Sequence, residues 1–177
     1  MGKRITVALD AMGGDYAPLE TVKGAVDAVK ELDVNIKLVG PAEQLHAELA
    51  KYQYDKERIE IVHASEVIGT DESPTMAIRR KKDSSLVVAL NLVKNGEADA
   101  IVDDYPVLGY AVKNGQKLQL VGDKETGSSY GFAVKKGQNP ELIKKFNAGL
   151  KNLKDNGTYD KILNNYLATG DETNTQD

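Results

Sequence analysis

The sequence predicts an α/β fold, arranged as a single three-layer αβα sandwich around a mostly parallel sheet. Short apolar runs alternate with stretches of helical periodicity, which is typical of βαβ units. The chain has 177 residues, enough for one domain with its own core. It contains no cysteine, so disulfides and zinc–thiolate sites are excluded.

Four apolar runs predict the parallel strands of this sheet. They are "RITVAL" (4–9), "VNIKLVG" (34–40), "RIEIVH" (58–63) and "ADAIV" (98–102). The segments between them have suitable length and periodicity for helices at 18–32, 41–51 and 74–95. The last helix is expected to break near Asp83, because Asp and Ser side chains compete for helical backbone hydrogen bonds.

The regular alternation of strands and helices ends after the fourth strand. The expected elements are a helix at 106–114, strands at 118–122 and 130–135, and two final helices. The sheet can therefore include one antiparallel strand, at 130–135. Asn139 as N-cap and Pro140 at the first helical position open the first of the final helices, and Gly157 ends it. The almost wholly polar residues 169–177 predict a flexible tail, which leaves 1–168 as one domain.

Charge and hydropathy argue against nucleic-acid binding and against a membrane-spanning segment. Residues 1–100 hold 13 Lys and Arg against 17 Asp and Glu, and residues 101–177 hold 10 against 10, so neither part is a basic nucleic-acid surface. The first apolar run is interrupted by Asp10 and is too short for a signal peptide or a membrane span. We expect a soluble, cytoplasmic chain without cofactor or metal, for which an oligomer is allowed.

The segment "LDAMGGDYAP" (9–18) follows the first strand and leads into the first helix. Gly13 and Gly14 let the backbone approach a ligand, and free N–H groups at a helix start favour anions. The flanking Asp10 and Asp15 indicate a polar cleft at the carboxyl edge of the sheet. A βα turn can also require glycine for its own geometry, so both interpretations stay open.

A basic run, "RRKKDSS" (79–85), lies on the third predicted helix. Arg79 and Lys82 are candidates for binding phosphate or another anion. The run also fits a solvated helix face, because successive residues are rotated by about 100° and cannot all reach one ligand. His46 and His63 have no evident triad or metal partner and are interpreted as structural.

Three segments share a resemblance: "VALDAMGGDYAP", "IKLVG" and the run from "RIEIVHASEVIG" to "NLVKNGEADA". Over nearly all of residues 3–100 they resemble the N-terminal part of PlsX-type phosphate acyltransferases. These bacterial enzymes convert acyl-carrier-protein thioesters and phosphate into acyl phosphates for phospholipid synthesis. The resemblance implies that the loop at 10–15 and the basic helix at 79–82 border a phosphate and acyl cleft.

The resemblance stops inside the fourth strand. In that family a loop of the type "SAGNTGA" follows, and then a much longer second part, whereas this chain reads "ADAIVDDYPVLGY" (98–110). The adjoining cleft loop is therefore replaced. The sequence predicts one side of an acyltransferase cleft without a complete acyl-transfer site.

A second resemblance covers residues 95–167. The segments "GEADAIVDDYPVLGYAVKN", "YGFAVKKG" and "NGTYDKI" are similar to the C-terminal part of the amino-acid-binding proteins of ABC transporters, especially the glutamine type. The family position two residues before the proline, which accepts the α-ammonium group of the amino acid, is Asp104 here. Asp103 and Asp104 can instead cap the helix that begins near Pro106 and face its positive dipole.

Both resemblances meet in "NGEADAIVDDYP" (95–106), which we call the junction. The sequence is thus interpreted as a hybrid, acyltransferase-like over 1–100 and binding-protein-like over 101–168. Three functional hypotheses follow. They are a chimeric domain with at most weak anion or small-molecule binding, a phosphate acyltransferase, and an amino-acid-binding module.

Overall fold

The computed structural model describes residues 3–69, 72, 74–103, 105–121, 134–135 and 139–167. The chain divides into two compact units, Met1–Asp104 and Tyr105–Asp177, which are described separately below. Within the described ranges, no helix is long and apolar enough to cross a membrane. The predicted α/β class is confirmed. A single domain over 1–168 stays a prediction.

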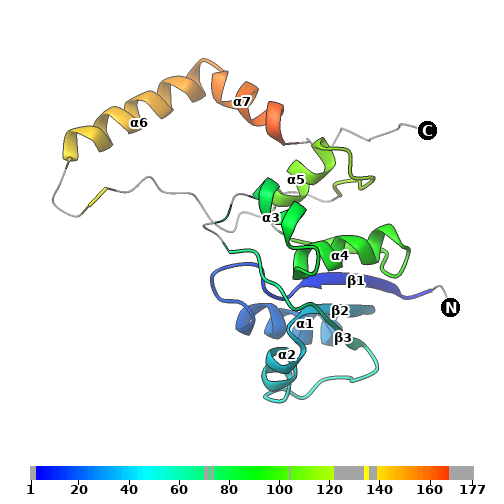
Figure 1. Ribbon diagram of the computed structural model, residues 1–177. Coiled ribbons are helices and arrows are strands. Elements are labelled where there is room, and N and C mark those ends of the chain that lie inside the picture. The colour runs from blue at the N-terminus through cyan, green and yellow to red at the C-terminus, as the bar shows by residue number, and fades with distance from the viewer. Residues whose placement is uncertain are drawn as a thin grey trace. The chain divides into compact units, whose positions relative to one another are not determined.

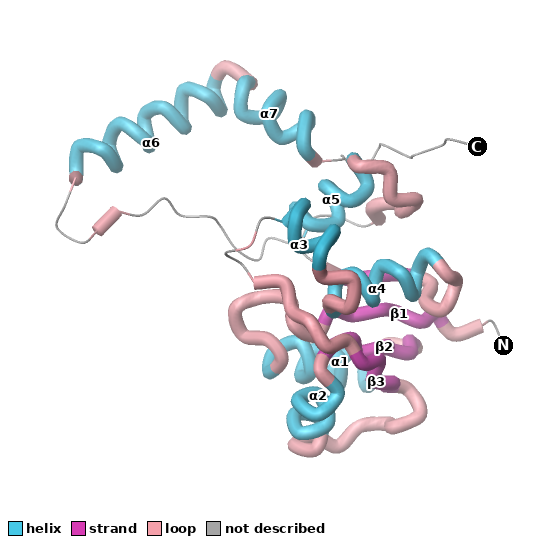
Figure 2. The backbone as a smooth tube through the Cα atoms, in the orientation of Figure 1, coloured by secondary structure: helices cyan, strands magenta, loops and turns pink. Residues whose placement is uncertain are grey.

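The first unit contains a four-stranded parallel sheet in the order β3-β2-β1-β4. Figure 2 shows β1, β2 and β3 side by side. The strands are β1 (Ile5–Asp10), β2 (Val34–Gly40), β3 (Ile59–His63) and β4 (Ala100–Val102). All four coincide with predicted strands to within two residues. Because the strands are parallel, their carboxyl ends meet at one edge, and Leu9 of β1 is paired with both Leu38 and Val102.

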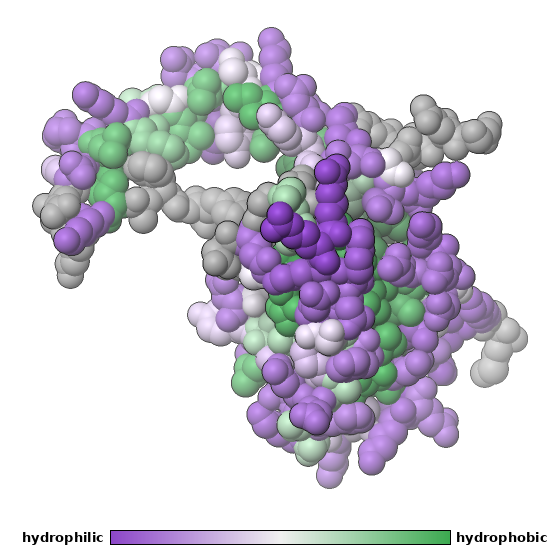
Figure 3. Space-filling view, in the orientation of Figure 1, coloured by the Kyte–Doolittle hydropathy of each residue, from purple (hydrophilic) through white to green (hydrophobic). Residues whose placement is uncertain are grey.

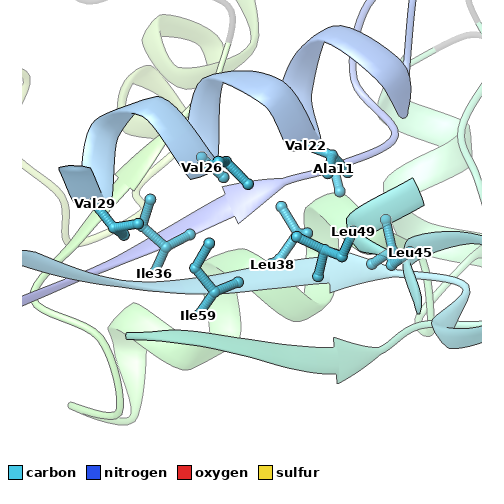
Figure 4. Close-up of a cluster of buried hydrophobic side chains, with 10 residues drawn as sticks. Ala11, Val22, Val26, Val29, Ile36, Leu38, Leu45, Leu49 and Ile59 are labelled. Carbon is cyan, nitrogen blue, oxygen red and sulfur yellow. The ribbon is translucent and has the colours of Figure 1, made fainter. Parts of the chain in front are cut away.

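Two helices, α1 (Leu19–Glu31) and α2 (Ala42–Leu49), pack on one face of this sheet. Val22, Val26 and Val29 recur at helical spacing on α1, so they form one stripe that points at β2 (Figure 4). The stripe closes over Ile36 and Leu38. These side chains are 5% exposed or less, so this layer is the principal core of the unit.

The opposite face is covered by α4 (Ser85–Lys94), which makes the unit three layers deep (Figure 1). Ala89 and Leu92 of α4 pack on Ala8 and Val39 of the sheet. The Ser84 hydroxyl caps the helix by accepting a hydrogen bond from the Val87 N–H at 3.4 Å. The predicted helix break is confirmed, because four residues separate the end of α3 (Pro74–Arg80) from the start of α4.

The second unit contains the helices α5 (Tyr105–Lys113), α6 (Pro140–Asp155) and α7 (Thr158–Tyr166). α7 contacts both α5 and α6. Gly157 connects α6 to α7 in a left-handed conformation with φ of 72°, which glycine adopts without steric cost. Among the described side chains of α6 and α7 none is buried, in contrast to α1 and α4.

Of the two strands predicted in this unit, one is wrong and the other lies mostly outside the described residues. The prediction of a strand at 118–122 is wrong for residues 118–121, which are not part of any strand. An apolar run becomes a strand only where a neighbouring strand satisfies its backbone hydrogen bonds, and Val121 at the end of this run is 79% exposed. Residue 122 and most of 130–135 lie outside the described residues, as do the tail at 169–177 and Asp104.

Candidate functional site

Two carboxylates follow neighbouring strands at the carboxyl edge of the sheet. Asp10 is the last residue of β1, and Asp103 comes directly after β4. Since Leu9 pairs with Val102, the parallel register places the two aspartates at the same level. A Cβ atom added at Gly13 would lie 3.6 Å from Asp103 Oδ1 and 3.7 Å from Asp10 Cγ. The two aspartates and Gly13 therefore form one cluster, which we call the edge site.

Asp10 is the most enclosed member of the edge site, with 8% of its surface exposed. Its Oδ1 accepts a hydrogen bond from the Met12 N–H at 2.9 Å. Burial raises the pKa of Asp10 above its ordinary value of 3.8, and hydrogen bonds from the Ser85 hydroxyl and from the N–H groups of Met12 and Gly13 offset this only in part. The group thus ionises at a higher pH than a solvated aspartate.

These contacts show how the glycine loop is arranged. The sequence suggested that N–H groups near Gly13 and Gly14 would be available to an anion, but those of Met12 and Gly13 donate to the Asp10 carboxylate. Position 14 favours glycine because its φ is +93°, a backbone conformation that other residues rarely adopt. Gly14 and Asp15 are exposed, while Gly13 is half-buried.

The loop does not lead directly into a helix start. α1 begins at Leu19, five residues after Gly14, with Pro18 at the N-cap position. The Thr21 hydroxyl donates to the carbonyl oxygens of Ala11 and Pro18, at 2.7 and 3.0 Å, and so fastens the loop to the first turn of α1. The positions of the two glycines therefore depend on the end of β1 and on the contacts of Asp10, and not on the N-terminus of α1.

The basic candidates form no described contact with the edge site. Arg79 and Lys82 are exposed, and the Lys82 ammonium donates to the Ile78 carbonyl at 3.3 Å. Lys81 is held by Glu72 and by the Val67 carbonyl. Within the described ranges, neither Arg79 nor Lys82 forms a hydrogen bond or ion pair with the edge site, so their anion-binding role stays a prediction.

Sequence reasoning missed two members of this arrangement. Ser85 is 1% exposed and donates to Asp10, although its "DSS" segment was interpreted only as a helix break. Asp103 was interpreted as a helix cap, and the structure places it beside Gly13. The available signal was the parallel register, since residues that end adjacent parallel strands share one edge. Asp104, the candidate ammonium acceptor, lies outside the described residues.

A second polar cluster follows β3. The Asp83 carboxylate accepts hydrogen bonds from the backbone N–H and the hydroxyl of Ser65, which hold the pKa of Asp83 below 3.8. His63 accepts a hydrogen bond at Nδ1 from the Ala42 N–H, at 3.2 Å. Since the Ser65 hydroxyl is committed to the carboxylate and not to the imidazole, this is not a nucleophile–base pair. The cluster fastens the β3 strand end to the start of α4.

A shallow pocket of about 110 Å³ lies on the amino half of the sheet, away from the edge site. Its lining includes Lys37 and Glu60, which form an ion pair at 2.8 Å. Metal binding has no comparable candidate, since no group of three or more His, Asp or Glu side chains suited to an ion occurs among the described residues. The edge site is therefore the strongest candidate for a ligand site, because its carboxylates lie at the carboxyl edge of the sheet, where parallel sheets usually bind their ligands.

Comparison with known proteins places the first unit in a family. The model of the family described as "Fatty acid synthesis protein" matches residues 5–103. The phosphate acyltransferase of Clostridium kluyveri is 57% identical over 96 residues, which is 54% of this chain and 29% of that protein. The phosphate acyltransferase of Dictyoglomus turgidum is 51% identical over 96 residues, with the same coverage. The chain thus spans less than a third of the length of these curated relatives.

Two solved structures show weaker likeness. The open substrate-binding domain 2 of Lactococcus lactis GlnP has a TM-score of 0.44 and 21% identity, covering 94% of this chain and 97% of that chain. A phosphotransacetylase from Streptococcus pyogenes has a TM-score of 0.40 and 18% identity, covering 73% of this chain and 41% of that chain. Likeness at this level assigns no ligand.

The resemblance predicted for residues 1–100 is confirmed by these comparisons, and the role of residues 101–168 stays a prediction. The family match ends at Asp103, one residue before the first structural unit ends. Because residues 5–103 make up more than half of the chain, the protein belongs, through that part, to the fatty acid synthesis protein family that this model describes.

Proposed function

We propose that this protein is a hybrid α/β protein that binds a small polar molecule weakly at the edge site and does not carry a complete acyl-transfer site. The observation that supports the proposal is the position of Gly13. Its missing side chain leaves room between the carboxylates of Asp10 and Asp103, each within 4 Å of where a Cβ would lie. Glycine at such a point lets a ligand approach the backbone closely.

The charges of the edge site favour a ligand that donates hydrogen bonds. Two carboxylates border Gly13, and the nearby N–H groups of Met12 and Gly13 already donate to Asp10. A dianion such as phosphate would meet like charge there, whereas an ammonium or hydroxyl group would meet acceptors. A small amino acid therefore fits the edge site better than phosphate does.

The expected affinity is low. One hydrogen bond to a charged group contributes about 1.5–3 kcal/mol, and the ordering of the ligand offsets part of this contribution. A dissociation constant near 1 mM corresponds to only about 4 kcal/mol of binding free energy. We expect millimolar binding or weaker from the full chain.

Calorimetric titration of the full chain with glutamine and with inorganic phosphate tests this proposal. We expect weak heat with glutamine, its loss in Gly13→Ala, and its retention in Gly24→Ala, whose added methyl group meets open space on α1. Absence of heat with glutamine, or undiminished binding by Gly13→Ala, would overturn the proposal. Phosphate binding that depends on Gly13 would replace it with an anion site.

The two neighbouring aspartates can be separated in the same assay. Asp103→Asn is expected to remove glutamine binding, since Asp103 borders Gly13. The resemblance to amino-acid-binding proteins assigns the ammonium group to Asp104 instead. If Asp104→Asn abolishes binding while Asp103→Asn does not, the chain acts as a binding-protein-like module and the edge site is not the ligand site.

Phosphate acyltransferase activity is the second candidate, and the family match over residues 5–103 favours it. The chain that follows Asp103 does not share that match, which supports the hybrid interpretation. A folded sample supplied with acyl-carrier-protein thioester and phosphate is expected to form no acyl phosphate. Acyl phosphate formed in proportion to protein concentration would establish the enzyme and reject the proposal of an incomplete site.

A further inference from the structure

Asp10 is one of two buried carboxylates in the described part of the first unit. Hydrophilic side chains cover much of this unit on the face that Figure 3 shows, and most of its Asp and Glu side chains are exposed. Glu48, the other buried carboxylate, forms an ion pair with Lys51 at 2.6 Å. Asp10 forms no ion pair with any described residue and is held by hydrogen bonds. Since a buried charge is costly without such partners, the charged state of Asp10 depends on these bonds.

The hydrogen bonds of Asp10 connect three segments of the first unit. Its carboxylate, at the end of β1, accepts from the N–H groups of Met12 and Gly13 in the glycine loop (11–15). It also accepts from the hydroxyl of Ser85, the first residue of α4. Hydrogen bonds to an ionised group are roughly twice as strong as neutral ones, and a carboxylic acid must place a hydrogen on one oxygen. Protonation of Asp10 therefore weakens the connection between these segments.

Met12 extends this connection to the neighbouring strand. A Cβ atom added at Gly40, the last residue of β2, would lie 3.0 Å from Met12 Cγ and 3.4 Å from the Met12 sulfur. The Met12 side chain thus lies directly against Gly40, while its N–H is bonded to Asp10 at 2.9 Å. Since Gly13 is the next residue, its position beside Asp103 depends on both contacts of Met12.

The charged side chains on the elements around β1 are exposed or paired with other groups. Lys37, the one charged residue of β2, pairs with Glu60 at 2.8 Å. Asp15 in the loop is exposed. So are all the charged side chains of α1 and α4, which are Glu20, Lys23, Asp27, Lys30, Glu31 and Lys94. β4 carries no charge, but Asp103, which follows it, belongs to the edge site. Asp10 and Asp103 are therefore the two groups whose ionisation bears on that site.

We propose that the charge of Asp10, acting through Met12, holds the glycine loop in the arrangement that admits a ligand, so that protonation of Asp10 weakens binding at the edge site. Asp10 is then a positioning residue, and Asp103 is the acceptor that meets the ligand. This role rests on the proposed function of the edge site. Burial raises the pKa of Asp10 above 3.8, so ligand affinity is expected to rise with pH through the folded pKa of Asp10 and to stay level above it. By linkage, ligand binding lowers that pKa.

Proton–nitrogen correlation NMR spectra of the full chain, recorded from about pH 3 to about pH 7, test the link through Met12 without any ligand. The Met12 amide is expected to shift with a midpoint above 3.8, and this shift is expected to be absent in Asp10→Asn. Thr6 is the matched control, because its N–H also donates to a carboxylate at 2.9 Å, that of Asp99, whose pKa lies below 3.8. A Met12 amide that shifts together with Thr6, or that still shifts in Asp10→Asn, would overturn the proposal.

Titration with glutamine in the same spectra tests the control of binding. The affinity read from the Gly13 amide is expected to fall by up to about tenfold for each pH unit below the folded pKa of Asp10, the limit set by one proton. In Asp10→Asn, which carries no charge at any pH, binding is expected to be weak and to change little with pH. Equal affinity of the wild type at both ends of the range would overturn the proposal. So would an equal pH dependence in Asp10→Asn, which would assign the dependence to Asp103.

Gly40→Ala separates the position of the loop from the charge of Asp10. Its methyl group would lie 3.0 Å from Met12 Cγ, so glutamine affinity is expected to fall by a similar factor at every pH. Gly24→Ala, whose methyl group meets open space, is expected to keep the wild-type affinity, and circular dichroism verifies that both variants are folded. Unchanged affinity in Gly40→Ala would overturn the role of Met12. Glutamine that perturbs no amide at any pH overturns the proposed function itself, whereas affinity that does not vary with pH overturns only its control by Asp10.

Discussion

The two units of this protein differ in how they bury apolar surface. In the first, α1 and α2 close over β2, and Val26, Leu38 and Leu45 are 0% exposed. In the second, α6 and α7 have no buried residue among those described, although both are amphipathic. Since burial supplies most of the stabilising free energy of a fold, the described residues of the first unit contribute more of it than those of the second.

The boundary between the units agrees with the family comparison. The first unit ends at Asp104, and the family match ends at Asp103. Both lie within the junction at 95–106, where the sequence interpretation placed the change from one family to the other. A parallel strand that ends in a loop is a position at which a βαβ unit can be joined to a new segment without losing its core.

The largest effect is expected from the principal core. Leu38→Ala in β2 should lower the free energy of unfolding by about 2–5 kcal/mol, because it removes a fully buried side chain and leaves a cavity. Leu142→Ala on α6, where the side chain is 47% exposed, should change it by about 0.5 kcal/mol or less. Urea denaturation of dilute samples, followed by circular dichroism, measures both. Equal losses would remove the contrast between the units.

A smaller effect is expected at Arg58. Its guanidinium donates to the carbonyl oxygens of Val29, Leu32 and Val34, which tie the end of α1 to the start of β2. Arg58→Ala should cost about 1–3 kcal/mol, and Arg58→Lys should not restore it, because an ammonium lacks the fork geometry.

Arg4→Ala is the matched control for Arg58. Arg4 pairs with the 80% exposed Asp33, so its loss should cost less than about 1 kcal/mol in the same denaturation assay. If the two alanine variants are equally stable, or if Arg58→Lys equals the wild type, the carbonyl contacts of Arg58 do not support the first unit.

The smallest expected effect is the pH dependence of stability that Asp10 contributes at the edge site. Asp99, outside that site, serves as the comparison. Burial raises the pKa of Asp10 above 3.8, so its contribution to stability is fully present below 3.8 and is lost as the pH rises through its folded value. The Thr6 N–H and Lys3 lower the pKa of Asp99, so its contribution is present above 3.8 and is lost as the pH falls through its folded value.

Denaturation from about pH 3 to about pH 7 compares Asp10→Asn and Asp99→Asn with the wild type. The stability difference, wild type minus variant, is expected to fall with rising pH for Asp10 and to rise with pH for Asp99. Slopes of the same sign at both positions would show that Asp10 is not the enclosed carboxylate described for the edge site.

The strands and helices of the first unit could be predicted because local pattern and tertiary packing agree there. Each of β1 to β3 is an apolar run with a neighbour on each side or a helix above it, and the "DSS" segment signals the break before α4. At 118–121 the same type of apolar run is not a strand. An apolar run favours burial, but it forms a strand only where the rest of the fold places a neighbouring strand beside it.

The edge site was predictable only in part. Asp10 and Gly13 could be found because they follow a strand, and the polar cleft at that edge follows from the fold class. The pairing of Asp10 with Ser85, and the place of Asp103 beside Gly13, depend on strand order and register, which no local pattern specifies. Arg79 and Lys82 remain unlinked to the site, because composition does not tell where basic side chains lie in the fold; Arg79 is on α3 and Lys82 is in the turn that follows it.

Hydrogen exchange of the full chain, measured by mass spectrometry, compares the two units amide by amide. Amides of β1, β2 and α1 are expected to exchange slowly, because their protection comes from the core of the first unit. Amides of α6 are expected to exchange faster, because none of its described side chains is buried. Protection of α6 that equals the protection of β2 would contradict the contrast between the two units.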